Sequence, residues 1–459
     1  MPIFERQSEV NCSAQELFDW HLRPGAFLRL APPWEPIELV SSEPVADGSR
    51  AVIRMPLAPG ISTTWTAEHS AIIRGEQFRD VALSGPFAKW EHTHRMEPIS
   101  EHRSRLVDRI NYEPPLRFLA NLVAGRLIRT KIERTFDYRH RITASDIDFH
   151  RRTSGDSLMK IAIGGSTGLV GTELVSFLAT GGHEVIRLMR KSAGTTSPYK
   201  QVQWNPSQGS IDSAGLEGCD AVVHLGGDNI AHGRWNAGKK RLIRDSRVIS
   251  TNLLAKTLAG LTQRPKVFVC ASAIGFYGDR GDEILTEESA PGPRFLSDVC
   301  REWEQATEPA RAAGIRVVNL RIGVVLTPKG AALQKMLSPF KLCLGGNVGN
   351  GQQWWSWVAI DDVLRSIEHC ISTESLSGPV NCVAPECLTN RDFTKTLGKV
   401  LSRPTLFPMP AFVVKTLFGE MGEELLLGSS RVVPTRLQQT AFEFACPTLE
   451  GGLRHLLGR

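Results

Sequence analysis

A chain of 459 residues is longer than one hydrophobic core normally supports, so two or three domains are expected. Its hydrophobic fraction of 41% and charged fraction of 22% are typical of a globular protein in water. The formal net charge of +6 is spread along the chain without a long basic run, which argues against a nucleic-acid partner.

Cysteine usage and the apolar runs limit the compartment and the kinds of site. The nine cysteines are scattered and include no Cys-x-x-Cys pair, so neither a disulfide framework nor a zinc site built from such pairs is expected. The first residues do not look like a signal peptide, and no apolar run approaches the length that spans a membrane. We therefore expect a cytoplasmic protein that does not insert into a membrane.

Residues 1–150 precede any nucleotide-binding pattern and are expected to form a domain of their own. A strand at 4–10 is followed by a short helix, for which Ser13 and Glu16 form a capping box. Strand-like stretches separated by Gly, Pro and Asp turns then predict an antiparallel meander. These stretches cover residues 49–55, 63–73, 77–83, 89–98 and 104–112. The apolar spacing of residues 115 to about 140 predicts one long amphipathic helix.

This order of elements, together with the stretch 85–94, resembles the helix-grip fold of START-like, polyketide-cyclase-like (SRPBCC) proteins. In that superfamily a long helix and a curved sheet enclose an apolar cavity, so the resemblance implies a domain that binds an apolar ligand. His92 and His94 share a strand face at the spacing of two metal ligands. No third ligand is in view, so polar residues on a sheet face are the favoured interpretation, as for Glu68 and His69. No metal site is predicted.

A domain boundary is expected before Met159. Residues 141–158 are expected to finish the long helix and become a polar linker, because Ser, Thr, Gly and Asp crowd the second half of this stretch, 151–158. From Met159 to the end of the chain, strands and helices alternate. That alternation predicts an α/β domain over 159–459, built on a doubly wound parallel sheet.

The clearest functional motif is Met-Lys-Ile-Ala-Ile-Gly-Gly-Ser-Thr-Gly-Leu-Val-Gly at 159–171, in which a buried strand runs into a glycine turn and a helix. Gly165 permits the sharp turn, Gly168 lets the backbone approach a pyrophosphate, and Gly171 lets the helix pack on the strand. The N–H groups at the helix start and the helix dipole favour an anion there. The motif predicts a dinucleotide cofactor.

The end of the next strand indicates which dinucleotide binds. A carboxylate normally stands there and bonds the ribose hydroxyls of NAD, but this chain reads Arg187-Leu188-Met189-Arg190-Lys191. Arg190 offers a bidentate fork and Lys191 a point charge to a 2′-phosphate. A solvated basic loop is the alternative. We favour NADP(H) over NAD(H).

Further elements are expected at the same edge of the sheet. A buried strand at 221–225 runs into Gly226-Gly227, where the cofactor of a parallel sheet lies. The helix that follows has a basic side, which has two interpretations. It is either simple solvated surface, or Arg247 on it reaches the cofactor phosphates. Asp361 or Asp362 is expected to cap a helix after the tryptophan-rich stretch at 354–357.

Motifs throughout the second part of the chain point to one family. They are Gly165-x-x-Gly168-x-x-Gly171, the stretches 224–230, 234–235, 245–247, 275–278, 355–362 and 447–449, and the C-terminal segments 408–410, 418–420, 425–427 and 431–436. Together they resemble the NAD(P)-dependent epimerase-like proteins of the atypical short-chain dehydrogenase/reductase superfamily. The resemblance runs from Met159 to Leu457 and implies an extended Rossmann-type domain, with 340–459 contributing the substrate side.

The resemblance also implies an NADP(H) site and a small-molecule substrate. Its residues would be Gly165, Ser166, Thr167, Gly168, Leu169 and Val170 at the pyrophosphate, Arg190 at the 2′-phosphate, Leu225 and Gly226 beside the adenosine ribose, Arg247, and Val325. Hydride transfer would be the core step, because the cofactor brings that chemistry and the protein supplies position.

One departure concerns catalysis. Short-chain reductases use Tyr-x-x-x-Lys on a helix, where the lysine lowers the pKa of the tyrosine so that its hydroxyl exchanges a proton. Here the corresponding positions are Leu296 and Cys300, and neither side chain can do this. The remaining candidate catalytic residues are Ser272, near the usual serine, and Tyr277.

We therefore predict an NADP(H)-dependent oxidoreductase or epimerase-like protein that acts on a small molecule and carries an N-terminal apolar-ligand-binding domain. The alternative is a non-catalytic NADP(H)-binding sensor or scaffold whose START-like domain binds a hydrophobic ligand. A third possibility is that the first domain hands a lipid-like substrate to the second. The sequence specifies neither the substrate nor the oligomeric state.

Overall fold

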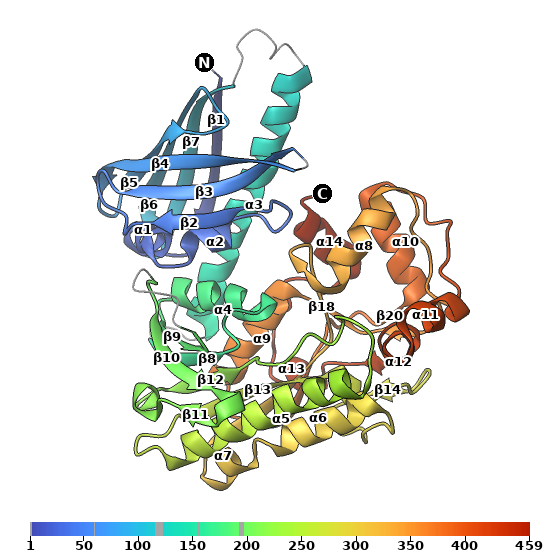
Figure 1. Ribbon diagram of the computed structural model, residues 1–459. Coiled ribbons are helices and arrows are strands. Elements are labelled where there is room, and N and C mark those ends of the chain that lie inside the picture. Colours follow the sequence, from blue (N-terminus) through green and yellow to red (C-terminus); the bar gives the residue numbers. More distant parts are fainter. Residues whose placement is uncertain (1, 59, 115–122, 154–156, 192–196) are drawn as a thin grey trace. The chain divides into compact units, whose positions relative to one another are not determined.

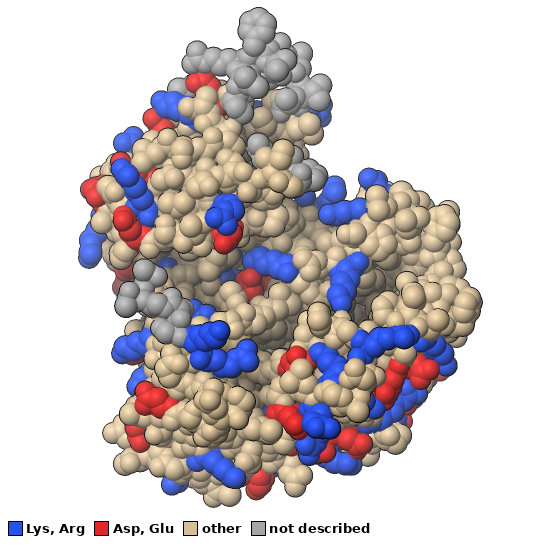
Figure 2. Space-filling model, viewed as in Figure 1, with Lys and Arg blue, Asp and Glu red and all other residues tan. Residues whose placement is uncertain are grey.

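The computed structural model describes residues 2–58, 60–114, 123–153, 157–191 and 197–459. The chain divides into two compact units (Figure 1). The first contains Met1–Ser157, Ser176–Gly182 and Gly458; the second contains Leu158–Val175, His183–Leu457 and Arg459. On the face that Figure 2 shows, Lys and Arg side chains are interspersed with Asp and Glu.

The first unit is built on a seven-stranded antiparallel sheet in the order β1-β7-β6-β5-β4-β3-β2. Its strands are β1 (Ile3–Val10), β2 (Glu38–Ser42), β3 (Arg50–Ala58), β4 (Ile61–Ile73), β5 (Gln77–Ser84), β6 (Lys89–Ser100) and β7 (Arg103–Glu113). Its helices are α1 (Ala14–Leu22), α2 (Ala26–Leu30) and α3 (Val123–Thr153). The meander matches the expected stretches, whereas β2 and α2 are additional elements. Ser13 caps α1 as expected, since its Oγ accepts a 3.1 Å hydrogen bond from the N–H of Glu16.

Strand β6 shows how the sequence pattern positions side chains in this unit. Trp90, His92, His94 and Met96 are buried, and most of the residues between them are partly exposed. Because side chains along a strand alternate between its faces, the same period of two that predicts the strand places two histidines in the interior. Aromatic rings surround them; Phe78, for example, stacks on His94 with ring centroids 4.2 Å apart.

The long helix ends within the stretch 141–158, which was expected to finish it and become a polar linker. Helix α3 runs from Val123 to Thr153, and residues 115–122 lie outside the described part. Ile142 and Ile147 are buried, so the apolar face of the helix continues into this stretch. Residues 151–153, expected to be linker, are therefore helical.

The second unit contains an eight-stranded sheet in the order β11-β10-β9-β8-β12-β13-β15-β19. Its strands are β8 (Lys160–Gly164), β9 (Glu184–Met189), β10 (Lys200–Asn205), β11 (Ser210–Ile211), β12 (Ala221–His224), β13 (Val267–Ala273), β15 (Arg316–Ile322) and β19 (Gly378–Cys382). All neighbours are parallel except β10 and β11. From β10 to β15 this is the 3-2-1-4-5-6 order of Rossmann folds, with the switch point between β8 and β12.

Helices and short strands complete this unit, and the last residues of α4, from Ser176, are counted with the first unit. The helices are α4 (Leu169–Thr180), α5 (Ala237–Gly260), α6 (Phe295–Gln305), α7 (Glu308–Ala312), α8 (Ala331–Lys341), α9 (Ile360–Ser372), α10 (Asn390–Leu401), α11 (Ala411–Phe418), α12 (Glu420–Gly422), α13 (Thr435–Gln439) and α14 (Leu449–Leu457). The short strands are β14 (Ile284–Leu285), β16 (Val324–Thr327), β17 (Trp354–Trp355), β18 (Trp357–Ala359), β20 (Leu388–Thr389) and β21 (Arg431–Val432). None of the described helices is long and apolar enough to cross a membrane.

The C-terminal segment is tied to the sheet domain by specific contacts. Strand β21 pairs in parallel with β14, which follows β13 in the chain. The N-cap position of helix α9 is Ala359, whose side chain makes no capping hydrogen bond. Asp361 and Asp362, expected to cap this helix, lie in its first turn instead. Asp362 accepts hydrogen bonds from the N–H groups of Ala445 and Cys446 at 2.6 and 3.0 Å, so it fastens the chain end to α9.

Candidate functional site

The glycine turn between β8 and α4 depends on two glycines for its own packing. Gly165 has a φ of +79°, and a Cβ there would lie 2.7 Å from the carbonyl carbon of Leu225. A Cβ on Gly171 would lie 2.1 Å from the Gly165 oxygen. A Cβ on Gly168 would meet only that same oxygen, at 3.3 Å. Gly168 therefore leaves the outer side of the turn open, as the close approach of a phosphate requires.

The turn lies at the switch point of the sheet and next to the loop after β12. The N–H of Leu225 donates a 2.8 Å hydrogen bond to the oxygen of Gly164, and Gly226 N would lie 2.8 Å from a Cβ on Gly165. The structure thus brings Leu225 and Gly226 against Gly165, as predicted for one nucleotide site. The first N–H groups of α4 have no partner within the helix and give the turn its affinity for anions.

The end of β9 contributes basic side chains beside this turn. Gly164 pairs with Leu188, so Arg190 and Lys191 follow β9 at the same edge of the sheet, and both are exposed. Arg187, half-buried in the strand, lies with its Nε 3.4 Å from the Oγ of Ser166. Because Arg187 stands in the middle of a strand pattern, the sequence did not single it out as a functional residue.

Arg247 supports the loop after β12. Its guanidinium donates to the backbone oxygens of Ile243 and Asp228 at 2.9 and 3.0 Å, and lies 5.1 Å from the ring centroid of Trp303. A Cβ on Gly227 would lie 3.0 Å from the guanidinium carbon. These contacts make Arg247 a positioning residue for the loop, so the expected contact with cofactor phosphates gains no support. Val325, on β16, is partly exposed and pairs with Val358.

The two candidate catalytic residues, Ser272 and Tyr277, belong to a buried polar network. Ser272 Oγ donates to Glu304 at 2.7 Å, and Glu304 accepts two hydrogen bonds from Arg321. The Tyr277 hydroxyl accepts from Arg321 at 2.9 Å and donates to Asn381 at 2.7 Å. Tyr277 is fully buried, and burial raises the pKa of its hydroxyl. Their geometry gives no support to a catalytic role.

Helix α6 carries Leu296 and Cys300, the residues predicted to stand where short-chain reductases have their catalytic tyrosine and lysine. Leu296 and Cys300 are both buried, and a Cβ on Gly275 would lie 3.2 Å from the Cβ of Leu296. Burial raises the pKa of the Cys300 thiol to about 12, so this cysteine stays protonated and is a poor nucleophile.

Glu424 lies beside Leu296, the residue predicted at the tyrosine position. Nothing in the sequence pattern singled out Glu424. Its Oε2 accepts a 3.2 Å hydrogen bond from the N–H of Leu296. Burial, with Glu420 nearby, raises the pKa of its carboxyl group. Glu424 belongs to a short π-helical turn, Glu423–Leu427, in the C-terminal segment. Such turns are frequent at functional sites.

Comparison with known proteins identifies the family. Residues 161–381 match the NAD dependent epimerase/dehydratase family, and residues 409–456 match a domain of unknown function, DUF1731. The epimerase family protein Mb2239 of Mycobacterium bovis is 37% identical over 299 residues, which are 65% of this chain and 98% of that protein. The chain belongs to the NAD-dependent epimerase/dehydratase family. The human family member SDR39U1 is 34% identical over 304 residues, 65% of this chain and 100% of that protein.

Two solved structures of epimerase family proteins extend the comparison. A nucleoside-diphosphate sugar epimerase from Corynebacterium glutamicum is 34% identical, with a TM-score of 0.81 over 99% of this chain and 90% of that chain. Human SDR39U1 with NADPH is 33% identical, with a TM-score of 0.60 over 65% of this chain and 99% of that chain. These relatives confirm the predicted Rossmann-type epimerase fold and the nicotinamide nucleotide as the family's cofactor. The START-like assignment of the first unit stays a prediction.

Proposed function

We propose that the second unit is an NADP(H)-dependent oxidoreductase or epimerase-like enzyme that acts on a small molecule. The observation that carries this proposal is the open glycine turn at the switch point of the sheet, with Arg190 in place of the carboxylate that selects NAD. The human relative solved with NADPH supports the same cofactor. When bound, a nicotinamide nucleotide supplies hydride transfer.

Each element around the turn has a part in this site. The start of α4 holds the pyrophosphate, and the exposed fork of Arg190 takes the 2′-phosphate. Arg247 keeps Gly226 and Gly227 in place through its bond to Asp228, so that the loop backbone lies beside the ribose. Arg187 orients the turn through Ser166.

Glu424 supplies the proton that the missing tyrosine would have supplied. In its neutral form the carboxyl group donates a proton to the substrate oxygen while the adjacent carbon receives hydride, and it is left as a carboxylate. In the reverse direction the carboxylate takes the proton from the hydroxyl group as hydride leaves the carbon. Burial raises the pKa of the Glu424 carboxyl group and so favours its protonated, proton-donating form.

The test is turnover with a panel of nucleoside-diphosphate sugars, the class named for the Corynebacterium relative. We expect the wild type to transfer hydride, and Glu424→Gln to lower kcat by roughly 10²–10⁴-fold. The neighbouring Glu423→Gln serves as the control, because Glu423 faces Lys415 instead of Leu296. Unchanged kcat in Glu424→Gln would overturn the role of this glutamate.

The burial of Ser272, Tyr277 and Cys300 favours a second candidate, a non-catalytic NADP(H)-binding sensor or scaffold. Its first unit would be a START-like, helix-grip domain that binds a hydrophobic ligand. The order of elements supports that assignment: one strand, two short helices, a meander and a closing helix. NADPH binding without turnover on any substrate of the panel would favour this candidate over the enzyme.

A further inference from the structure

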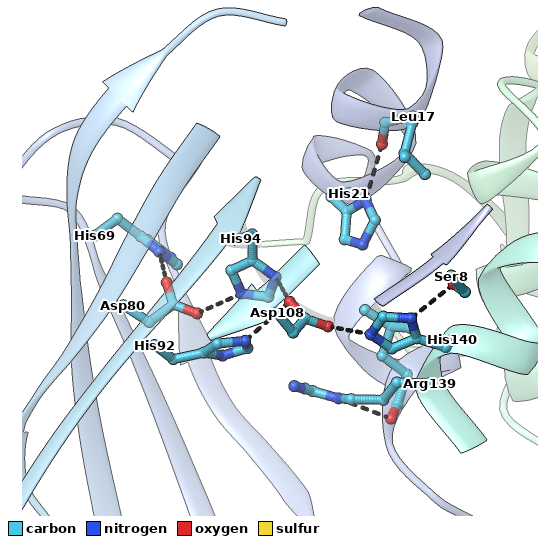
Figure 3. A network of polar contacts seen from close by, with 11 residues as sticks. Ser8, Leu17, His21, His69, Asp80, His92, His94, Asp108, Arg139 and His140 are labelled. Carbon is cyan, nitrogen blue, oxygen red and sulfur yellow. Dashed lines mark hydrogen bonds and ion pairs between the residues drawn. The ribbon is translucent and has the colours of Figure 1, made fainter. Parts of the chain in front are cut away.

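A cluster of histidine and aspartate side chains lies in the interior of the first unit (Figure 3). Asp80 on β5 is the strand partner of His92 on β6, and His94 follows on the same face of β6. One ligand atom from each of these three residues lies within 4.8 Å of the others. His92 and His94 are 2% and 5% exposed, so the cluster is shielded from water.

The three side chains are held by neighbours that fix their orientation. Asp108 lies with Oδ1 3.0 Å from His92 Nε2 and 2.7 Å from His94 Nδ1. On the other side, His94 Nε2 lies 3.2 Å from Asp80 Oδ2, and His69 Nδ1 lies 2.6 Å from Asp80 Oδ1. Outer carboxylates and imidazoles that orient ligands in this way are typical of metal sites.

Hydrogen bonding alone does not satisfy this cluster. Although His94 Nδ1 is only 2.7 Å from Asp108, the geometry is out of line for a hydrogen bond, and this buried atom has no hydrogen-bond partner in the part of the chain that the structure describes. Buried polar atoms in folded proteins almost always have a partner. A buried imidazole nitrogen whose contact with a carboxylate is not aligned as a hydrogen bond is therefore the feature that points to a missing ligand.

The charges of the cluster point to a cation. Asp108 is 2% exposed, and Asp80 is largely shielded. Among the described residues, both carboxylates pair with histidines, and neither forms an ion pair with a lysine or arginine, whose charge is permanent. Arg139 is nearby, but it donates to the backbone oxygen of Leu30 and lies over the ring of Phe136. Buried carboxylates are normally paired or bind a metal.

We propose that Asp80, His92 and His94 bind one divalent transition-metal ion. Two imidazoles and one carboxylate form the ligand set of zinc sites that keep an open position and of non-haem Fe(II) sites. Asp108 and His69 hold the ligands in place. A dication balances the two carboxylates while the imidazoles remain neutral.

Hydrogen bonds link the cluster to the surface of the first unit. His140, on α3, contacts the far oxygen of Asp108 at 2.9 Å and Ser8 at 2.7 Å. Both Ser8 and His140 line a surface hollow of about 370 Å³. The cluster and this hollow are thus connected by one chain of polar contacts.

The decisive experiment uses the full-length chain, purified without a histidine tag, stripped with a chelator and titrated with Co²⁺. We expect one equivalent of Co²⁺ to bind with visible d–d absorption, and Zn²⁺ to displace it at the same stoichiometry. Absence of saturable Co²⁺ and Zn²⁺ binding by the wild type would overturn the proposal, whatever the variants do.

Variants locate the site. His94→Gln and Asp80→Asn are expected to abolish the absorption, and Asp108→Asn to weaken metal affinity about 10–100-fold. His102→Ala, at the exposed turn before β7, is the matched control and should bind as the wild type does. Circular dichroism and the urea unfolding of each variant report whether its first unit is folded. Wild-type affinity in folded His94→Gln and Asp80→Asn would also contradict the site.

Discussion

At the scale of single residues, one glycine of the turn is needed for packing and another leaves room for the cofactor. A Cβ on Gly171 would meet backbone at 2.1 Å, whereas a Cβ on Gly168 would point to open space apart from one oxygen at 3.3 Å. The same residue type in one motif therefore serves two physical roles. The sequence spacing suggests both roles, but only the three-dimensional contacts assign them to positions.

Gly171→Ala is expected to destabilise the second unit by about 1–3 kcal/mol, because the backbone of Gly165 must move to admit the methyl group. Gly168→Ala is expected to leave the free energy of unfolding nearly unchanged and to weaken NADPH binding. Urea unfolding and nucleotide titration of both variants check this. Equal stability of the two variants would contradict the packing argument.

Tyr277→Phe tests the structural role that burial assigns to this residue. Removing the hydroxyl leaves Arg321 and Asn381 each without one hydrogen bond in the interior. We expect a loss of about 1–3 kcal/mol in the free energy of unfolding, with NADPH affinity and kcat per folded molecule unchanged. A fall in kcat at unchanged stability would instead restore Tyr277 as a catalytic residue.

At the scale of elements, strand order and helix ends follow from the sequence to different degrees. The alternation of strands and helices, and the glycines after β8, were sufficient to predict the Rossmann-type sheet, because both are local patterns. The end of α3 was predicted only to within the stretch 141–158, and buried Ile142 and Ile147 show that its apolar face continues into that stretch. Glu424 and Asp80 could not be found from spacing, since their partners, Leu296 and His94, come from other elements.

Asp362 gives a pH dependence at the junction of α9 and the chain end. Burial raises its pKa to about 6 from a usual value of 3.8. A folded-state pKa above that of the unfolded chain means that stability is greatest at low pH and is lost as pH rises toward the folded-state value. Lowering the pH from 7 to 5 should therefore stabilise the wild type by about 1 kcal/mol relative to Asp362→Asn. Denaturant titrations at both pH values measure the difference, and a change of opposite sign would contradict it.

At the scale of the whole molecule, the two units carry separable properties. The Mycobacterium bovis relative aligns over 98% of its own length with 65% of this chain, so proteins of this family exist that contain the second unit without the first. The C. glutamicum structure, in contrast, aligns with 99% of this chain. The nucleotide site thus belongs to the shared part, and the proposed metal site belongs to the additional unit.

A fragment of residues 158–459 is therefore expected to fold and to bind NADPH with an affinity close to that of the full chain. The same fragment should lose the saturable Co²⁺ binding completely, because Asp80, His92 and His94 are absent from it. Calorimetric titration of the fragment and of the full chain checks both expectations. NADPH binding only by the full chain would contradict the separation.

The assignment of NADP(H) to the second unit is tested by the ratio of the NADPH and NADH dissociation constants in the wild type and in Arg190→Ala. We predict that the wild type prefers NADPH strongly and that the variant loses this preference through weaker NADPH binding. Lys266→Ala, an exposed lysine at the opposite edge of the sheet, should keep the wild-type ratio. Equal affinity for the two nucleotides in the wild type, or no binding of either, would contradict this assignment.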